Sequence, residues 1–228
     1  AKTHGVMKTY KMVMNKLESP NPLGYSCAGE VIAVADDIKH LKVGDFVACG
    51  GQTANHSEVV VVPKNLCVKI DNPADVKSAA FATIGAIALQ GVRQAELTLG
   101  ENCVVIGLGI VGQLTAQLLR ASGINVIATD IDQNQVDLAR KNGFKNAFNS
   151  SDAAIGNVIE QITNGYGADA VIITAGTSSL EPVNFAGEIA RKKAKVVIVG
   201  AVPTGFDRKH YFKKEIDLRM SSSYGPGR

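Results

Sequence analysis

Three glycines at a spacing suited to phosphate binding are the first feature of this sequence that could do chemistry. They belong to the segment Gly107-Leu108-Gly109-Ile110-Val111-Gly112, which lies between an apolar run and a helical pattern. At such a junction the glycines permit a tight turn, close approach of a pyrophosphate to the backbone, and close packing of helix on strand. The helix N-terminus adds free N–H groups that attract phosphate. The segment therefore predicts a dinucleotide site, and the alternative is a tight turn alone.

An acidic side chain follows at the distance expected of a ribose ligand. Asp130 ends the next apolar run, and we expect it to contact the adenosine half of the cofactor together with Ile131. A carboxylate there accepts hydrogen bonds from both ribose hydroxyls and repels a 2′-phosphate, so NAD(H) is predicted rather than NADP(H). The alternative role for Asp130 is a helix N-cap, but Asp132 is better placed for capping.

Two further strand ends carry small residues. Ala175 and Gly176 follow one apolar run, and Gly200 follows the next. Ligands of open α/β sheets lie outside the carboxyl ends of the strands. We therefore expect these positions to give the nicotinamide half room near the backbone, although glycine at a strand end is also an ordinary turn residue.

The elements that would position these residues alternate from residue 76 onward. Some short runs are apolar at every position, which is typical of strands covered on both faces. They span 103–106, 125–128, 170–174 and 196–199, and 145–149 and 215–221 would complete six strands. Helical patterns lie between them, at 109–121, 133–141, 154–163 and 181–190. The alternation predicts an α/β fold with a doubly wound parallel sheet of the Rossmann type.

Residues 1–75 have a different pattern. Short β-type runs at 31–34, 46–48 and 59–62 are separated by turn-forming residues, which predicts a small antiparallel barrel or sheet. A helix over 76–92 is predicted to join this part to the second domain, residues 76–228.

Composition excludes several classes of protein. The 228 residues are 46% hydrophobic and carry a net charge of only +3, which argues against a disordered chain, a nucleic-acid-binding surface and a polybasic membrane patch. No apolar stretch is long enough for a transmembrane helix. The four cysteines are isolated in the sequence, so we expect free thiols in a reducing, cytoplasmic compartment.

Together these residues resemble the medium-chain dehydrogenase/reductase superfamily, which includes the zinc-type alcohol dehydrogenases. The similarity covers the glycine segment, Asp130, Ala82-Thr83, 42–47 and Gly24-Tyr25-Ser26-Cys27-Ala28-Gly29. It implies a GroES-like domain beside a Rossmann domain, hydride transfer between nicotinamide and a small carbonyl or alcohol substrate, and a homodimer formed through the edge of the Rossmann sheet. Within the superfamily, the chain is most similar to the first half of bi-domain oxidoreductases.

The zinc ligands of that superfamily are replaced here. Tyr25-Ser26 stands where zinc members carry a His-Glu pair, Ala79 stands at a further ligand position, and no cysteine precedes Cys27. A zinc site needs at least three protein ligands, so no zinc is expected. The resemblance leaves two catalytic candidates. Thr83 matches a threonine near the nicotinamide ring, and Tyr25 would donate a proton from the place of a metal ligand.

The leading hypothesis is an NAD(H)-dependent oxidoreductase that works without a metal. The alternative is a non-catalytic dinucleotide-binding module of a larger enzyme. A methyltransferase with a similar glycine loop is disfavoured by the β-rich first segment and by Thr83. Because members of the superfamily are longer at both ends, we expect the GroES-like domain to be truncated. The chain alone is then expected to bind cofactor but to turn over poorly.

Overall fold

The computed structural model describes residues 22–226 together with residues 5, 7, 10 and 14. The chain divides into two compact units, Ala1–Ala80 and Phe81–Arg228, whereas the sequence analysis placed the boundary after residue 75. In the part of the chain that the structure describes, no helix is both long and apolar enough to cross a membrane.

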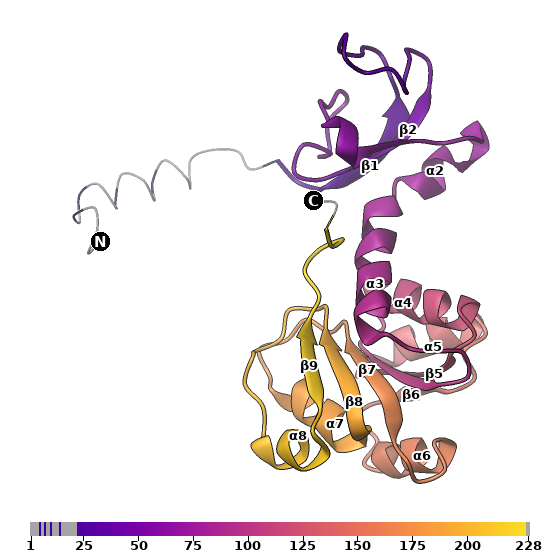
Figure 1. The fold of residues 1–228 in the computed structure, drawn as a ribbon, viewed down its shortest axis with the longest axis vertical. Coiled ribbons are helices and arrows are strands. Elements are labelled where there is room, and N and C mark those ends of the chain that lie inside the picture. Colours follow the sequence, from indigo (N-terminus) through magenta and orange to yellow (C-terminus); the bar gives the residue numbers. More distant parts are fainter. Residues whose placement is uncertain (1–4, 6, 8–9, 11–13, 15–21, 227–228) are drawn as a thin grey trace. The chain divides into compact units, whose positions relative to one another are not determined.

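The second unit is built on a parallel sheet of six strands (Figure 1). The strands are β4 (Asn102–Ile106), β5 (Asn125–Asp130), β6 (Ala147–Asn149), β7 (Ala168–Ile173), β8 (Ala190–Ile198) and β9 (Asp217–Met220). Their order across the sheet is β6-β5-β4-β7-β8-β9, and every neighbouring pair is parallel. From β4 the chain adds β5 and β6 on one side, and then crosses to add β7, β8 and β9 on the other side, as in a doubly wound sheet. The predicted Rossmann-type α/β fold is confirmed.

Helices cover both faces of this sheet. The helices α3 (Ala82–Ala95), α4 (Ile110–Ala121) and α5 (Gln133–Lys141) contribute to one hydrophobic core. The helices α6 (Ile155–Ile162), α7 (Glu181–Ile189) and α8 (Arg208–Lys214) contribute to the other. Successive residues of β4 alternate between the two layers, because Val105 joins the first core and Val104 the second. Burial on both faces is why the central strands β4 and β7 are apolar apart from Asn102 and Asp169 near their amino-terminal ends.

The first unit contains a small antiparallel sheet of three strands. They are β1 (Ser26–Glu30), β2 (Phe46–Gly50) and β3 (Cys67–Lys69), with β2 in the middle. A 3-10 turn, η1 (Lys64–Leu66), comes directly before β3, and a second one, η2 (Pro73–Asp75), and the short helix α2 (Val76–Ala79) follow it. The prediction of a small antiparallel sheet is confirmed.

Two of the predicted strands in this unit are wrong. At 31–34 only Val31 continues the pairing, through its N–H donated to the carbonyl of Asp45, and the residues beyond it are not strand. The run 59–62 is not a strand either, and the side chain of Val61 is 84% exposed. β-branched residues favour an extended backbone, but a strand also needs a hydrogen-bonded neighbour.

The predicted single helix over 76–92 is also wrong. The structure has α2 and α3 instead, separated at Ala80 and Phe81. Phe81 has φ −95° and ψ 4°, which leaves the geometry of an α-helix. Because the sequence at the break is apolar and contains neither glycine nor proline, no local signal marks it.

Candidate functional site

A cleft of about 270 Å³ lies at the carboxyl ends of the central strands of the second unit. It is beside β4, where the strand order reverses and where open α/β sheets bind ligands. The lining residues are Ile106, Gly107, Gly109, Asp130, Ile131, Ser150, Thr174, Ala175, Gly176, Thr177, Ser179, Glu181, Pro182 and Phe185. The structure therefore brings two of the predicted glycines, Asp130 and the end of β7 to one cleft.

The three glycines of the segment have different surroundings. Gly107 has φ +95°, and a Cβ there would lie 2.6 Å from the backbone nitrogen of Ala175. A Cβ on Gly112 would collide with the carbonyl oxygen of Gly107, which lets α4 approach the loop. A Cβ on Gly109 would meet no atom within 4 Å. Gly107 thus lets the loop pack on the end of β7, Gly112 lets α4 pack on the loop, and Gly109 leaves open space on the cleft side.

The N-terminus of α4 follows directly after this open space. Gly109 is the N-cap and has no side chain with which to cap the first turn, and the first turn contains no acidic residue. Leu108 is fully buried and fixes the loop to the core, whereas Ile110 is half exposed. Val111 lies in the first turn, and its carbonyl accepts a hydrogen bond from Thr115 Oγ1 at 2.8 Å. Backbone N–H groups at such a helix start, with the helix dipole behind them, favour an anion.

The carboxylate of Asp130 is fixed to this loop. Its Oδ2 accepts a hydrogen bond from the Leu108 N–H at 2.5 Å, and its Oδ1 accepts one from the Asp132 N–H at 2.8 Å. An ionised carboxylate has about four acceptor directions. Two directions are therefore left for other donors, and the two N–H groups hold the side chain in one orientation.

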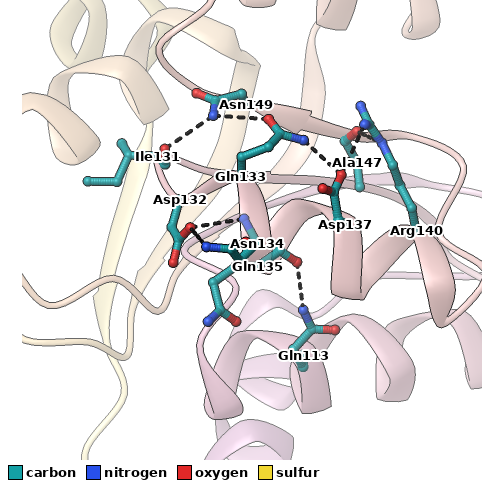
Figure 2. Close-up of polar contacts among 10 residues, drawn as sticks. All are labelled: Gln113, Ile131, Asp132, Gln133, Asn134, Gln135, Asp137, Arg140, Ala147 and Asn149. Atoms are coloured by element: carbon teal, nitrogen blue, oxygen red, sulfur yellow. Dashed lines mark hydrogen bonds and ion pairs between the residues drawn. The ribbon is translucent and has the colours of Figure 1, made fainter.

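Asp132 caps α5, as the sequence predicts. Its Oδ1 accepts hydrogen bonds from the backbone N–H of Asn134 at 2.9 Å and from the side-chain amide of Asn134 at 3.0 Å (Figure 2). The carbonyl of Ile131 accepts a hydrogen bond from Asn149 Nδ2 at 3.1 Å, which ties the turn after β5 to β6 (Figure 2). The side chain of Ile131 is 73% exposed and lines the cleft.

The end of β7 is attached to the glycine loop by a residue that the sequence analysis missed. Thr174 Oγ1 donates a hydrogen bond to the carbonyl of Gly107 at 2.6 Å. A Cβ on Gly176 would meet no atom within 4 Å, whereas a Cβ on Gly200 would collide with the carbonyl oxygen of Ala175. Gly176 therefore leaves room at the cleft, and Gly200, which is not among the lining residues, is required by packing.

Several polar lining residues were not predicted from the sequence. Ser150 directly follows β6. Because ligands of open α/β sheets lie outside the carboxyl ends of the strands, the end of this short strand is a signal that could have pointed to Ser150. Thr177 and Ser179 lie in the connection from β7 to α7, and Glu181 is the first residue of α7, a segment that carries no motif. Among the described residues that line the cleft, the charged side chains are Asp130 and Glu181 and none is basic.

The two catalytic candidates lie in different units. Tyr25 precedes β1 in the first unit, its side chain is 48% exposed, and its carbonyl accepts a hydrogen bond from the Gly51 N–H at 3.1 Å. Thr83 is the second residue of α3 in the second unit. Their predicted roles remain predictions.

The segments that would carry zinc ligands hold other groups. Ser26 Oγ donates a hydrogen bond to the carbonyl of Ala80 at 2.6 Å. Within residues 22–226 and the four other described positions, no group of three or more His, Cys, Asp or Glu side chains is arranged to hold a metal ion. A phenol, a hydroxyl already engaged with a carbonyl, and the methyl group of Ala79 do not fit a zinc site.

Comparisons with known families and proteins agree with this geometry. A model described as "Zinc-binding dehydrogenase" matches residues 111–228, and one described as "Alcohol dehydrogenase GroES-like domain" matches residues 3–72. The D-guloside 3-dehydrogenase of Shigella flexneri is 30% identical over 175 residues, which are 74% of this chain and 50% of that protein. The chain thus spans about half the length of this curated relative.

Solved structures with the same fold are more distant in sequence. Galactitol-1-phosphate dehydrogenase from Escherichia coli superposes with a TM-score of 0.78 at 22% identity, over 90% of this chain and 68% of that one. A mycobacterial protein complexed with NADPH gives a TM-score of 0.76 at 20% identity, over 90% and 66% of the two chains. At these identities the likeness supports the fold.

The first testable prediction concerns Asp132 as the N-cap of α5. Replacing Asp132 by alanine should lower the free energy of unfolding by about 1 kcal/mol, because the cap of α5 is lost. Urea denaturation measures the change. Asp137→Ala is the matched control, since this exposed carboxylate on the same helix pairs with Arg140 at 3.5 Å and should matter by a few tenths of a kcal/mol at most. Equal losses for both variants would contradict the capping role.

Proposed function

The chain belongs to the zinc-binding dehydrogenase family, and from this membership we propose that it is part of an NAD(H)-dependent oxidoreductase that transfers hydride without a metal. The single observation that supports this most strongly is the carboxylate of Asp130, held by the N–H of Leu108 inside the glycine loop. The proposed reaction is hydride transfer between a nicotinamide and a carbonyl or alcohol substrate. This activity is proposed for the whole protein, because the chain spans only about half the length of the curated relative D-guloside 3-dehydrogenase.

The cleft has the features required to hold a dinucleotide. A bound nicotinamide dinucleotide would supply the hydride-transfer chemistry. The open space at Gly109 and the N–H groups at the start of α4 would take its diphosphate. The two remaining acceptor directions of Asp130 would take the hydroxyls of the adenosine ribose. Gly176 would leave room for the other half of the cofactor.

The lining supports NAD(H) over NADP(H). A 2′-phosphate at the end of β5 would face Asp130 and would find no basic side chain among the described lining residues. The mycobacterial structural relative complexed with NADPH shares only 20% of residues with this chain, so its cofactor does not transfer directly.

For the chemical step we propose two residues. Thr83 would hydrogen-bond an oxygen of the substrate or cofactor, and Tyr25 would donate a proton from its phenol. The relative named D-guloside 3-dehydrogenase supports an alcohol of carbohydrate type as the substrate class. No metal ligand set is available to either residue within the described part of the chain.

We further propose that two copies associate through an edge of the sheet. The outer strand β9 presents its free edge, and the side chain of Met220 on it is 59% exposed. Unpaired backbone groups at a sheet edge are suited to pairing with a second copy. A cytoplasmic location stays a prediction, supported by the four free cysteine thiols.

The second prediction tests the cofactor. NADH should bind more tightly than NADPH, and Asp130→Ser should weaken NADH binding about ten- to a hundred-fold because a charged hydrogen bond is lost. Isothermal titration with both cofactors gives the two dissociation constants. Loss of the bond to Leu108 would loosen the loop for both cofactors alike, so the ratio of the constants isolates the ribose contact. Asp137→Ser on the surface of α5 is the control, and equal affinities in the unaltered protein would refute the assignment.

The third prediction tests the reaction. Because this chain alone is expected to turn over poorly, the assay uses the whole protein, in which adding an alcohol or ketone of the substrate class should change the absorbance of the reduced nicotinamide. Tyr25→Phe removes only the phenol oxygen and should lower kcat by about 10²-fold or more, with NADH affinity unchanged. Unchanged kcat in this variant would rule out the proton donor. NADH binding with no turnover on any sugar, polyol or aldehyde would favour a non-catalytic dinucleotide module instead.

The fourth prediction concerns the metal. The purified protein should hold no stoichiometric zinc, because the chain lacks a suitable ligand set at Tyr25, Ser26 and Ala79. Elemental analysis measures the zinc content, and a chelator should leave the melting temperature unchanged. One tightly held zinc per chain would contradict the metal-free mechanism without affecting the dinucleotide site.

A further inference from the structure

Three of the four cysteines, isolated in the sequence, lie side by side in the first unit. Each of the three strands contributes one: Cys27 on β1, Cys49 on β2 and Cys67 on β3. The register places Cys27 opposite Cys49, and Cys49 opposite Cys67. Residues directly opposite each other in an antiparallel sheet point to the same face, so the three thiols form a row.

The two pairs in this row differ in their backbone hydrogen bonds. The N–H of Gly51 donates to the carbonyl of Tyr25, so every second pair from there, including Cys27 with Cys49, is a hydrogen-bonded pair. The N–H of Ile70 donates to the carbonyl of Phe46. Phe46 and Ile70 are therefore a hydrogen-bonded pair, and hydrogen-bonded and non-hydrogen-bonded pairs alternate along the strands. Cys49 and Cys67, three positions further along the register, are thus a non-hydrogen-bonded pair.

This difference favours a disulfide between Cys49 and Cys67 over one between Cys27 and Cys49. Opposite Cα atoms are about 4.5 Å apart in non-hydrogen-bonded pairs and about 5.5 Å apart in hydrogen-bonded pairs, and the side chains are closer in the former. Both spacings lie in the range of about 4.4 to 6.8 Å that a disulfide spans. The Sγ atoms of Cys49 and Cys67 are 3.8 Å apart, with the Cys49 thiol donating to the Cys67 sulfur. The two sulfurs are in contact and unbonded, and a disulfide would bring them to about 2.05 Å.

The surroundings indicate where a reaction would begin. Cys49 is buried beside Val47 and Ala54, and burial, with the neighbouring thiols, raises its pKa to about 12. Burial also raises the pKa of Cys27. Cys67 lies on the edge strand β3 and is partly exposed, so it is the thiol of this pair that an oxidant in solution can reach.

We propose that Cys49 and Cys67 are a site of reversible oxidation, at which a hydroperoxide converts the two thiols into a cross-strand disulfide. The sulfur of Cys67 attacks the peroxide oxygen, an S–O bond forms, the O–O bond breaks, and the first water leaves with the thiol proton. The sulfur of Cys49 then attacks Cys67 Sγ, the S–S bond forms, and the S–O bond breaks with loss of a second water. Two thiols and one hydrogen peroxide thus give one disulfide and two waters.

Oxidation would give a covalent cross-link between the middle strand β2 and the edge strand β3 of the small sheet. The bond would close a loop between residues 18 positions apart, which restricts the unfolded chain. Because Cys49 is a weak nucleophile while its proton is held, formation should be slow and should follow sustained rather than brief exposure to peroxide. The site is independent of the dinucleotide assignment, since all three thiols lie in the first unit.

The fifth prediction tests this site on the intact protein. Hydrogen peroxide, followed by alkylation under denaturing conditions and peptide mass spectrometry, should reveal a peptide pair joined through Cys49 and Cys67. The mass of this joined pair should be two hydrogen atoms below the sum of the two thiol peptides, and dithiothreitol should release both peptides. Cys103, fully buried in the second unit, should remain alkylatable and serves as the internal control. The oxidised protein should melt on the order of 5 °C higher.

Single variants sharpen the test. Cys67→Ser should abolish the cross-link, whereas Cys27→Ser and Cys103→Ser should retain it. If Cys67→Ser fails to fold, Cys67→Ala, which adds no polar atom, replaces it. A dominant link between Cys27 and Cys49 would overturn the choice of pair. Sulfinic acid at Cys67 without a link, a link between two chains, or no oxidation would overturn the proposal, and none of these results bears on NADH binding.

Discussion

The hydrogen bond from the Leu108 N–H to the Asp130 carboxylate is the interaction on which the arrangement of the cleft depends. It joins the glycine loop after β4 to the last residue of β5, and the Gly107 N–H reinforces the junction by donating to the carbonyl of Thr129 at 2.8 Å. Thr174 holds the same loop from the side of β7. The loop is therefore fixed from both neighbouring strands before any ligand arrives. Since a preorganised site loses less conformational entropy on binding, these bonds favour affinity as well as stability.

Much of the second unit could be predicted because its constraints are local in the sequence. α5 begins and ends at the predicted residues, since an N-cap aspartate and a glycine just past the end mark both termini. β8 begins at Ala190, well before the predicted 196–199, because its first residues are basic rather than apolar. Arg191 pairs there with Asp169 at 2.6 Å. A strand whose charges are satisfied by partners distant in the chain carries no hydrophobic signal of its own.

The first unit was less predictable, because its order comes from pairing between distant segments. The valines at 59–62 have a strong β preference yet lie outside the sheet, whereas the short β3, with Val68 exposed, lies inside it. The row of Cys27, Cys49 and Cys67 has the same origin. Spacing in the sequence says nothing about register, and a shift of one residue would send a side chain to the opposite face. Strand ends and the glycine segment pointed to part of the cleft, such as Gly109, Asp130 and Gly176, but the thiol row needed the register.

The hydrogen bond between Ser26 and Ala80 gives a physical account of a dehydrogenase fold without a zinc ligand set in its described residues. The two positions matched to zinc ligands, in the segment at β1 and in α2, lie on either side of this bond. A metal would join such segments through several strong bonds, whereas one neutral hydrogen bond contributes about 0.5 to 1.5 kcal/mol. This hydrogen bond joins the segment at β1 to the residue that follows α2 within the first unit. Under the proposed function, Tyr25 in the first unit and Thr83 in the second would supply the hydroxyl groups for the chemical step. The proposed cofactor site, by contrast, lies within the second unit, where the Asp130 and Thr174 contacts that fix the glycine loop are made.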